Sequence, residues 1–87
     1  PRTKKYQPLR EFLSTQPETK ASLSLSFAGI EQIINDRLPA SARKYPAWWS
    51  NDSTHSQAWS WLAEGWKTKK CELRAQTVNF ERFHMGF

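Results

Sequence analysis

The chain has 87 residues, 38% of them hydrophobic and 14% aromatic, and a formal net charge of +5. This composition is typical of one small globular domain and excludes a disordered chain. The single cysteine, Cys71, excludes an intramolecular disulfide and a cysteine-rich zinc site. We expect no transmembrane helix and no signal peptide, because no long apolar run is present, and hence a cytoplasmic protein without membrane association.

The N-terminal part of the chain combines a basic arm with a helical pattern. Residues 1–5 are polar and basic without periodicity, so we expect a flexible basic arm there and a single domain over residues 6–87. Hydrophobic side chains then recur at helical spacing and predict a helix over residues 6–16. Pro17 is expected to end this helix.

The next segment predicts a strand followed directly by a helix. Serine and hydrophobic residues alternate strictly over residues 22–27, which is typical of a short, half-buried strand. The Ser26 side chain is placed to cap a second helix over residues 27–35. Asn35 and Asp36 are expected to end that helix.

A long segment without clear periodicity separates the second helix from the third. It runs over residues 37–53 as a loop, in which Pro39 can start one short helical turn. Tyr45 and Pro46 would stop that turn.

The third helix is predicted from its two ends. Thr54 and Gln57 have the spacing of a capping box, and Gly65 is a natural C-terminal stop. Together they predict a helix over residues 54–65.

Two strands are expected to close the chain as a β-hairpin. They lie over residues 66–73 and 77–83, separated by a tight turn. Cys71 and Leu73 on the first strand should share an inner face with Val78 and Phe80 on the second.

All five tryptophans lie between positions 48 and 66. Trp59 falls on the apolar stripe of the third helix, so we expect it, together with Trp66, to be in the core. Trp61 lies about 200° further round the helix. It would therefore pack under the long loop or be exposed.

The adjacent pair Trp48 and Trp49 cannot easily fill one core pocket. We expect one ring to be structural and the other to contact a ligand, and we assign Trp49 the structural role, with Trp48 and Asn51 pointing outward. The structural alternative is that one ring is buried as a lid over the helices and its neighbour is half-exposed without a ligand. If both rings belonged to the core, the stacking role would be lost.

In chain order the expected elements are helix, strand, helix, helix, strand and strand. This order resembles a winged-helix domain, in which a three-helix core carries a small sheet and a terminal hairpin forms the wing. The resemblance covers residues 6–83 and implies an α+β fold with three helices, a small antiparallel sheet and a C-terminal β-hairpin. The chain departs from that pattern between the two central helices. A turn of about 3–4 residues is usual there, whereas this chain has the long loop over residues 37–53.

A second resemblance rests on a sequence pattern that can be abbreviated LPxSAR…WWxN…W…GW. The residues that carry it are Tyr6/Pro8/Leu9, Leu38-Pro39, Ser41-Ala42-Arg43, Trp48-Trp49, Asn51, Gln57, Trp61, Gly65-Trp66 and Val78/Phe80/Arg82. In this pattern the chain resembles a small bacterial family of uncharacterised proteins and appended domains. The resemblance implies no mechanism.

Few residues are suited to catalysis. The acids are scattered, the three glycines form no phosphate loop, and no histidine is spaced to activate Cys71. The one plausible constellation is Asn51, Asp52 and His55, and His55 is explained more simply as a residue of the first helical turn. We therefore expect that the protein is not an enzyme and that it has no metal site and no cofactor.

The basic residues and the tryptophan-rich segment together predict a DNA-binding module, with RNA a less favoured ligand. Lysine and arginine attract phosphates, a helix N-terminus can bind one, tryptophan stacks on bases, and Asn or Gln amides can pair with adenine. The predicted nucleic-acid-binding residues are Arg43, Lys44, Trp48, Asn51, His55, Gln57, Lys67, Lys69, Lys70 and Arg74.

These residues also have structural or solubilising explanations. Asn51 suits a turn, Gln57 completes the capping box, and lysines discourage pairing of an edge strand. Two other functions stay open: a protein-interaction module with a tryptophan hot spot, and an aromatic cage for a modified or flipped base. Steep salt dependence would indicate phosphate binding rather than a tryptophan hot spot.

Overall fold

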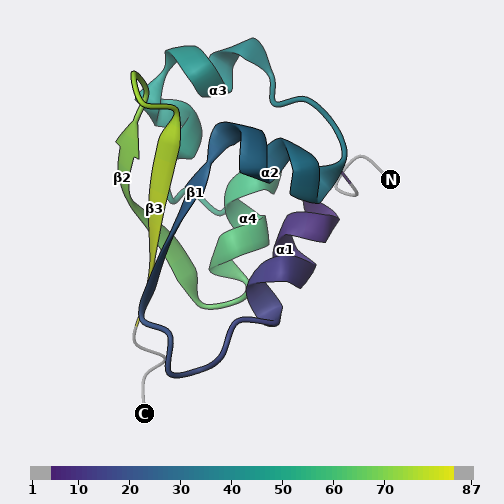
Figure 1. Cartoon of the computed structure of the whole chain (residues 1–87), viewed down its shortest axis with the longest axis vertical. Helices are drawn as coiled ribbons and strands as arrows, with labels where there is room; N and C mark the ends of the chain where they lie inside the picture. The colour runs from purple at the N-terminus through teal and green to yellow at the C-terminus, as the bar shows by residue number, and fades with distance from the viewer. Residues whose placement is uncertain (1–4, 84–87) are drawn as a thin grey trace.

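The computed structural model describes residues 5–83. Residues 1–4 of the arm expected over residues 1–5, and the end of the expected domain, residues 84–87, lie outside the described residues. Lys5, the last residue of the expected arm, lies in a short 3-10 turn just before α1. Figure 1 shows the arrangement of the elements. These elements are α1 (Gln7–Ser14), β1 (Ser22–Ser26), α2 (Phe27–Ile34), α3 (Ala40–Lys44), the 3-10 helix η2 (Pro46–Trp49), α4 (Ser56–Leu62), β2 (Trp66–Glu72) and β3 (Thr77–Arg82).

The predicted α+β class is confirmed. One three-stranded antiparallel sheet has the order β1-β3-β2, so β1 and β2 are its two edges. Helices cover the face on which Val78 and Phe80 are buried, as Figure 1 shows for the arrangement of the layers. The described residues contain four α-helices rather than three, because the turn expected at Pro39 is the complete helix α3.

Local sequence signals set the boundaries of β1 and α2. The Ser26 hydroxyl accepts a hydrogen bond from the Gly29 N–H at 2.9 Å, which caps α2 as expected. Asn35 follows α2 in the left-handed region, at φ 54°, and ends it. Both signals act within a few residues of the chain, so the sequence is sufficient to locate them.

The start of α4 differs from the prediction. The helix begins at Ser56, and the expected capping box does not form, because Asp52 accepts hydrogen bonds from both the backbone and the hydroxyl of Thr54. Gln57 is 8% exposed and donates instead to the Trp48 carbonyl at 3.2 Å. The loop before α4 is therefore tied to its own residues and to η2, and this delays the helix by two residues.

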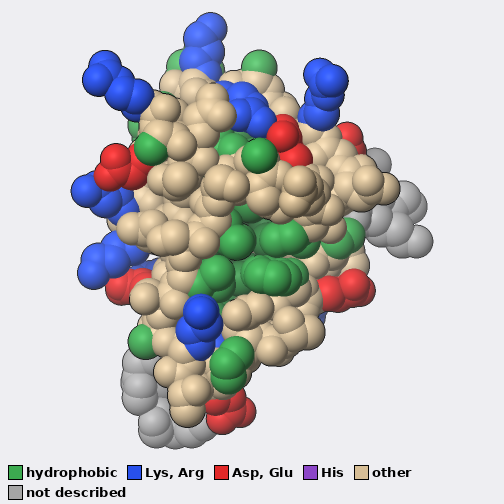
Figure 2. Space-filling view, viewed as in Figure 1, with side chains coloured by type: hydrophobic (Ala, Val, Ile, Leu, Met, Phe, Trp, Pro, Cys, Tyr) green, Lys and Arg blue, Asp and Glu red, His purple; other side chains and the backbone are tan. Residues whose placement is uncertain are grey.

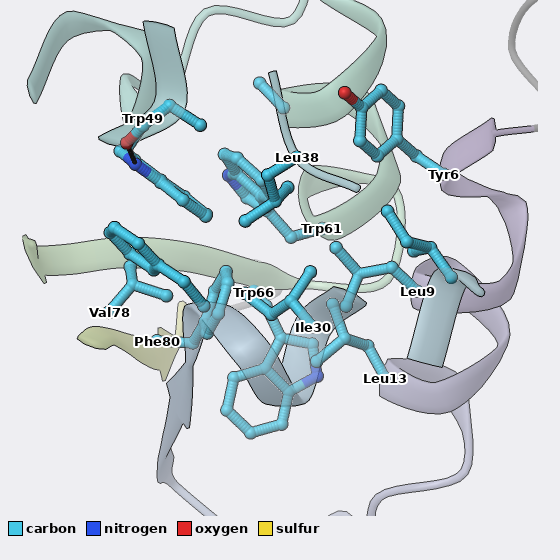
Figure 3. Packing of buried hydrophobic residues seen from close by; sticks show 14 residues of the cluster. Tyr6, Leu9, Leu13, Ile30, Leu38, Trp49, Trp61, Trp66, Val78 and Phe80 are labelled. Carbon is cyan, nitrogen blue, oxygen red and sulfur yellow. Dashed lines mark hydrogen bonds between the residues drawn. The ribbon is translucent and has the colours of Figure 1, made fainter. Parts of the chain in front are cut away.

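Aromatic rings form a continuous stack through the core (Figure 3). Phe27 lies parallel to Trp49 at 5.0 Å between ring centroids, and Trp49 lies parallel to Trp61 at 6.0 Å. Phe80 meets the edge of Trp61 at 5.5 Å. Trp66 is also fully buried, as predicted. One core thus joins α2, η2, α4 and the sheet.

The predicted core position of Trp59 is wrong. Its side chain is 43% exposed, whereas Trp61 is completely buried under η2, the first of the two alternatives expected for it. The inner face of α4 carries Gln57, Ala58, Ser60 and Trp61. The helix is rotated from the simple apolar stripe because η2 supplies a stacking partner, Trp49, on the side of Trp61.

Candidate nucleic-acid interface

The Asn51 side chain joins the loop before α4 to the edge strand β2. Its Nδ2 donates to the Thr68 carbonyl at 3.0 Å, while its Oδ1 accepts from the Thr68 N–H at 2.9 Å and from Trp61 Nε1 at 3.0 Å. Thr68 also donates its hydroxyl to the Trp49 carbonyl at 2.6 Å. A bidentate adenine contact needs both atoms of the amide, so the expected adenine contact of Asn51 conflicts with this bonding.

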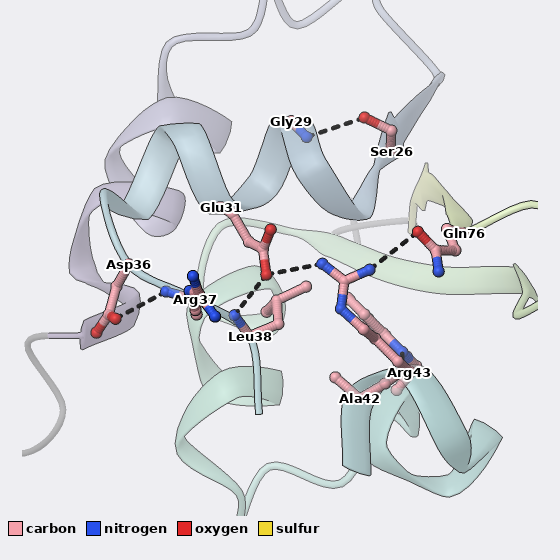
Figure 4. A network of polar contacts seen from close by, with 10 residues as sticks. Ser26, Gly29, Glu31, Asp36, Arg37, Leu38, Ala42, Arg43 and Gln76 are labelled. Atoms are coloured by element: carbon pink, nitrogen blue, oxygen red, sulfur yellow. Dashed lines mark hydrogen bonds and ion pairs between the residues drawn. The ribbon is translucent and has the colours of Figure 1, made fainter. Parts of the chain in front are cut away.

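Arg43 is held inside a polar network that Figure 4 shows. Its Nη2 donates to Glu31 at 2.8 Å and its Nη1 to the Gln76 side chain at 2.9 Å. The Leu38 N–H donates to the same Glu31 oxygen, and these two donors lower the pKa of the Glu31 carboxyl from its ordinary 4.5. Arg43 therefore braces α2, α3 and the hairpin turn, with both terminal nitrogens of its guanidinium engaged inside the protein.

The tryptophan pair is divided between core and half-exposed positions. Trp49 is 2% exposed and donates its indole N–H to the Ala42 carbonyl at 2.8 Å, which confirms its structural role. Trp48 is half-buried, with the Tyr6 ring at 6.0 Å and the Trp49 ring at 4.6 Å. Trp48 does not project freely outward, and with Trp49 buried the pair forms no open cage around a base.

The remaining predicted cations lie on and beside β2. The Arg43–Gln76 hydrogen bond holds α3 against the hairpin turn. This contact brings Lys44, at the end of α3, to the same side of the molecule as the basic residues of the hairpin. Figure 2 shows lysine and arginine side chains along β2, at the hairpin turn and around α3, with acidic side chains between them. We call this set the basic edge: Lys44, Lys67, Lys69, Lys70 and Arg74.

Two carboxylates contact the basic edge. Lys69 Nζ lies 3.6 Å from Glu81, and Lys70 Nζ lies 3.1 Å from Glu72. Both lysine side chains remain well exposed, at 71% and 65%, and ion pairs of this kind contribute little and yield readily to a stronger anion. The basic edge keeps an excess of positive charge.

The possible catalytic constellation, Asn51, Asp52 and His55, lies on an exposed part of the surface. His55 lies 3.6 Å from Asp52, and both side chains are more than half exposed. Hydrogen bonds from the Thr54 hydroxyl and N–H lower the pKa of Asp52, and burial, with a contribution from Glu72, raises the pKa of Cys71. The Cys71 thiol is thus held in its unreactive, protonated form. Within residues 5–83 no three metal-ligating side chains come together.

Trp59 is a surface feature that the sequence analysis missed. The Arg10 guanidinium lies 4.4 Å from the centre of its ring and bonds to Glu64 at 2.8 Å. A shallow depression of about 360 Å³ is lined by Trp59 and three small hydroxyl side chains, Ser53, Thr54 and Ser56. No signal in the sequence indicates that Trp59 is exposed. Each face of α4 carries one tryptophan, so the residue type does not distinguish the buried face from the exposed one.

The chain belongs to the family described as Domain of unknown function (DUF7662), whose model matches residues 6–83. No curated protein and no solved structure matches the chain. None of the helices between residues 5 and 83 is long and apolar enough to cross a membrane.

Proposed function

We propose that this chain is a non-enzymatic nucleic-acid-binding module that holds phosphates along the basic edge. The observation that carries the proposal is the five cations along β2, the hairpin turn and α3, against the two carboxylates of Glu72 and Glu81. Lysine and arginine on one face are the electrostatic footprint of phosphate binding. DNA is the favoured ligand, and the proposed chemistry needs no cofactor.

The arrangement of elements supports this function. A helix, a strand, two further helices and a C-terminal hairpin follow one another, and β1 joins the hairpin to complete the sheet. We infer a winged-helix-like module in which β2, β3 and their turn act as the wing. The extra helices α3 and η2, inserted before α4, are this chain's departure from that architecture.

The contacts of the amide side chains favour binding to the nucleic-acid backbone over base readout. Asn51 bonds to Thr68 and Trp61, and Gln57 is buried against Trp48. Phosphate contacts position a protein on the duplex without reading its sequence. We therefore propose low sequence specificity.

The test is a titration of duplex DNA at several salt concentrations, with two matched double variants. Lys69→Gln/Lys70→Gln removes two charges from the basic edge, and Lys20→Gln/Arg37→Gln removes two exposed charges elsewhere. We expect the first variant alone to flatten the plot of log affinity against log salt, by about 0.9 for each phosphate that the protein no longer neutralises. Equal effects of both variants, or no binding by the unaltered chain at low salt, would overturn the proposal.

A protein-interaction module is the second candidate, and exposed Trp59 is the observation that favours it. Tryptophan and arginine are enriched in interface hot spots, and Trp59 carries a stacked Arg10 beside a shallow depression. Binding of this kind would respond strongly to Trp59→Ala and weakly to salt. DNA binding along the basic edge would instead respond weakly to Trp59→Ala and strongly to salt.

We also propose an origin and a location for the chain. The LPxSAR…WWxN…W…GW residues make many of the internal contacts described above, so we propose that this pattern is the structural signature of the family in bacteria. The lone Cys71 suits a reducing cytoplasm.

A further inference from the structure

The outer edge of β1 has a row of backbone groups directed away from the sheet. The Phe27 N–H bonds to the Gln76 carbonyl and the Arg82 N–H to the Ala21 carbonyl, each at 2.8 Å, so the odd-numbered residues of this segment pair with β3. Neighbouring residues of a strand direct their backbone groups to opposite sides. The backbone N–H and C=O groups of Ser22 and Ser24 therefore point outward. No group within residues 5–83 forms a hydrogen bond with these backbone groups.

Nothing in the sequence of β1 protects this edge. Its five residues, Ser-Leu-Ser-Leu-Ser, include no charge and no proline, and their register with β3 runs without a bulge. Proteins usually blunt an edge strand with lysine, proline or a bulge, because an open edge pairs with another strand. The edge of β1 is therefore suited to accept one.

The β1 sequence reads the same in both directions. In an antiparallel pair centred on Ser24, Ser24 faces Ser24 of a second copy, Leu23 faces Leu25, and Ser22 faces Ser26. The outward backbone groups of Ser24 then form a reciprocal hydrogen-bonded pair across a two-fold axis. Each leucine meets a leucine on the helix side of the sheet.

The distribution of charge also favours a second copy. Two chains of net charge +5 repel each other, so association is favoured at a strand that carries no charge, as β1 does. In the order β1-β3-β2, the uncharged strand lies at the opposite edge from the lysines of β2. Pairing at β1 keeps the two basic edges far apart.

Hydrophobic surface borders the same edge. Figure 2 shows hydrophobic side chains reaching the surface between β1 and the helices α1 and α2. The half-buried hydrophobic residues of these three elements are Phe12, Leu23, Leu25 and Ile33. A second copy that extends the sheet at β1 would cover part of this area.

We propose that the chain forms a two-fold dimer in which β1 pairs antiparallel with β1 of a second copy, centred on Ser24. The two sheets become one six-stranded sheet with a basic edge at each end. The contact is one short strand and its hydrophobic border, below the size of a standard stable interface, so the dimer forms at high protein concentration and dissociates on dilution.

Disulfide trapping tests the register. In a Cys71→Ser background, Ser24→Cys places two thiols beside the axis, where paired residues lie about 5.5 Å apart. Ser22→Cys is the matched control, since residue 22 faces residue 26 and two copies of it lie about 13 Å apart. We expect the first variant to cross-link at least about ten times faster than the second under mild oxidation. Equal rates, or no cross-link from either, would overturn the proposal.

Sedimentation of charged variants tests the contact in the natural sequence. The Ser24 hydroxyl donates to the Asn79 side chain at 2.6 Å, so Ser24→Lys and Asn79→Lys both remove this bond and add one charge to the outer face. Only Ser24→Lys sets two like charges against each other on the axis. We expect this variant to be monomeric and Asn79→Lys to dimerise like the unaltered chain. An unaltered chain that stays monomeric up to about 1 mM refutes the dimer.

Discussion

The two edge strands of the sheet, β1 and β2, differ in charge and in whether another part of the chain bonds to them. At β2 the Asn51 side chain forms hydrogen bonds with both backbone groups of Thr68, and a bulge interrupts the register between Thr68 and Lys70. Three lysines lie within this strand. At β1 the register is continuous and the residues are serine and leucine. One edge is thus closed to strand pairing and carries the charge, while the other is open and neutral.

This difference shows what the long connection between α2 and α4 contributes. Its residues supply Trp49 to the core and Asn51 to the β2 edge, and the same loop brings α3 against the hairpin turn. Within residues 5–83, no such connection bonds to the outer edge of β1. The β2 edge is therefore closed at Thr68 by a segment from elsewhere in the chain, in addition to its bulge and its lysines.

The largest expected effect comes from the tryptophan that anchors the loop closing β2. Trp49→Ala removes a buried ring stacked between Phe27 and Trp61, and we expect a loss of about 3–5 kcal/mol in the free energy of unfolding. Trp59→Ala, on the exposed face of α4, should cost less than about 1 kcal/mol. Chemical denaturation measures both. Similar losses for the two variants would contradict the assignment of the inner face of α4.

Removal of the amide that closes β2 should have the next largest effect. Asn51→Ala leaves the buried indole N–H of Trp61 without its acceptor and frees both backbone groups of Thr68. We expect a loss of about 2–4 kcal/mol, measured by thermal and urea unfolding. Ser24→Ala on the open edge is the control and should stay within about 0.5 kcal/mol of the unaltered chain. A loss below about 1 kcal/mol for Asn51→Ala would show that this edge does not depend on the amide.

The hydroxyl of Thr68 provides a finer test of the same edge. Thr68→Val keeps the shape of the side chain but removes the hydrogen bond to the Trp49 carbonyl, at an expected cost of about 1–2 kcal/mol. Thr77→Val on β3 is the matched control, because within residues 5–83 the Thr77 side chain makes no hydrogen bond. Urea denaturation of both variants separates the effect of the missing hydrogen bond from the general effect of the substitution. Equal costs would remove the special role of Thr68.

The smallest expected effect concerns the network that holds α3 at the hairpin turn. Since the folded-state pKa of Glu31 is lowered from 4.5, its carboxylate stabilises the fold above that pH and loses this effect as the pH falls through the folded pKa. Glu31→Gln should therefore cost about 1 kcal/mol at neutral pH, and the cost should shrink below pH 4.5. Unfolding free energies from pH 7 downward measure the difference, and a cost independent of pH would contradict the role of the charge.

Much of the fold was predictable because its signals are local. The alternation of β1, the Ser26 cap and the left-handed Asn35 each involve residues close together in the chain, and each element formed near its predicted position. The register of Cys71 with Val78 likewise follows from the strands and their tight turn. Of the candidate site, the lysines of β2 could be placed on one strand from their spacing alone.

Tertiary contacts decided the rest. The sequence by itself determined the α+β class and the basic strand, because hydrophobic periodicity and charge are properties of short segments. Its apolar stripe predicted Trp59 in the core of the protein, whereas the structure buries Trp61 instead. The choice depends on Trp49, which stacks on Trp61, and on Asn51, which accepts its indole proton. These partners are ten or more residues away, and only the folding of the long loop brings them to the helix.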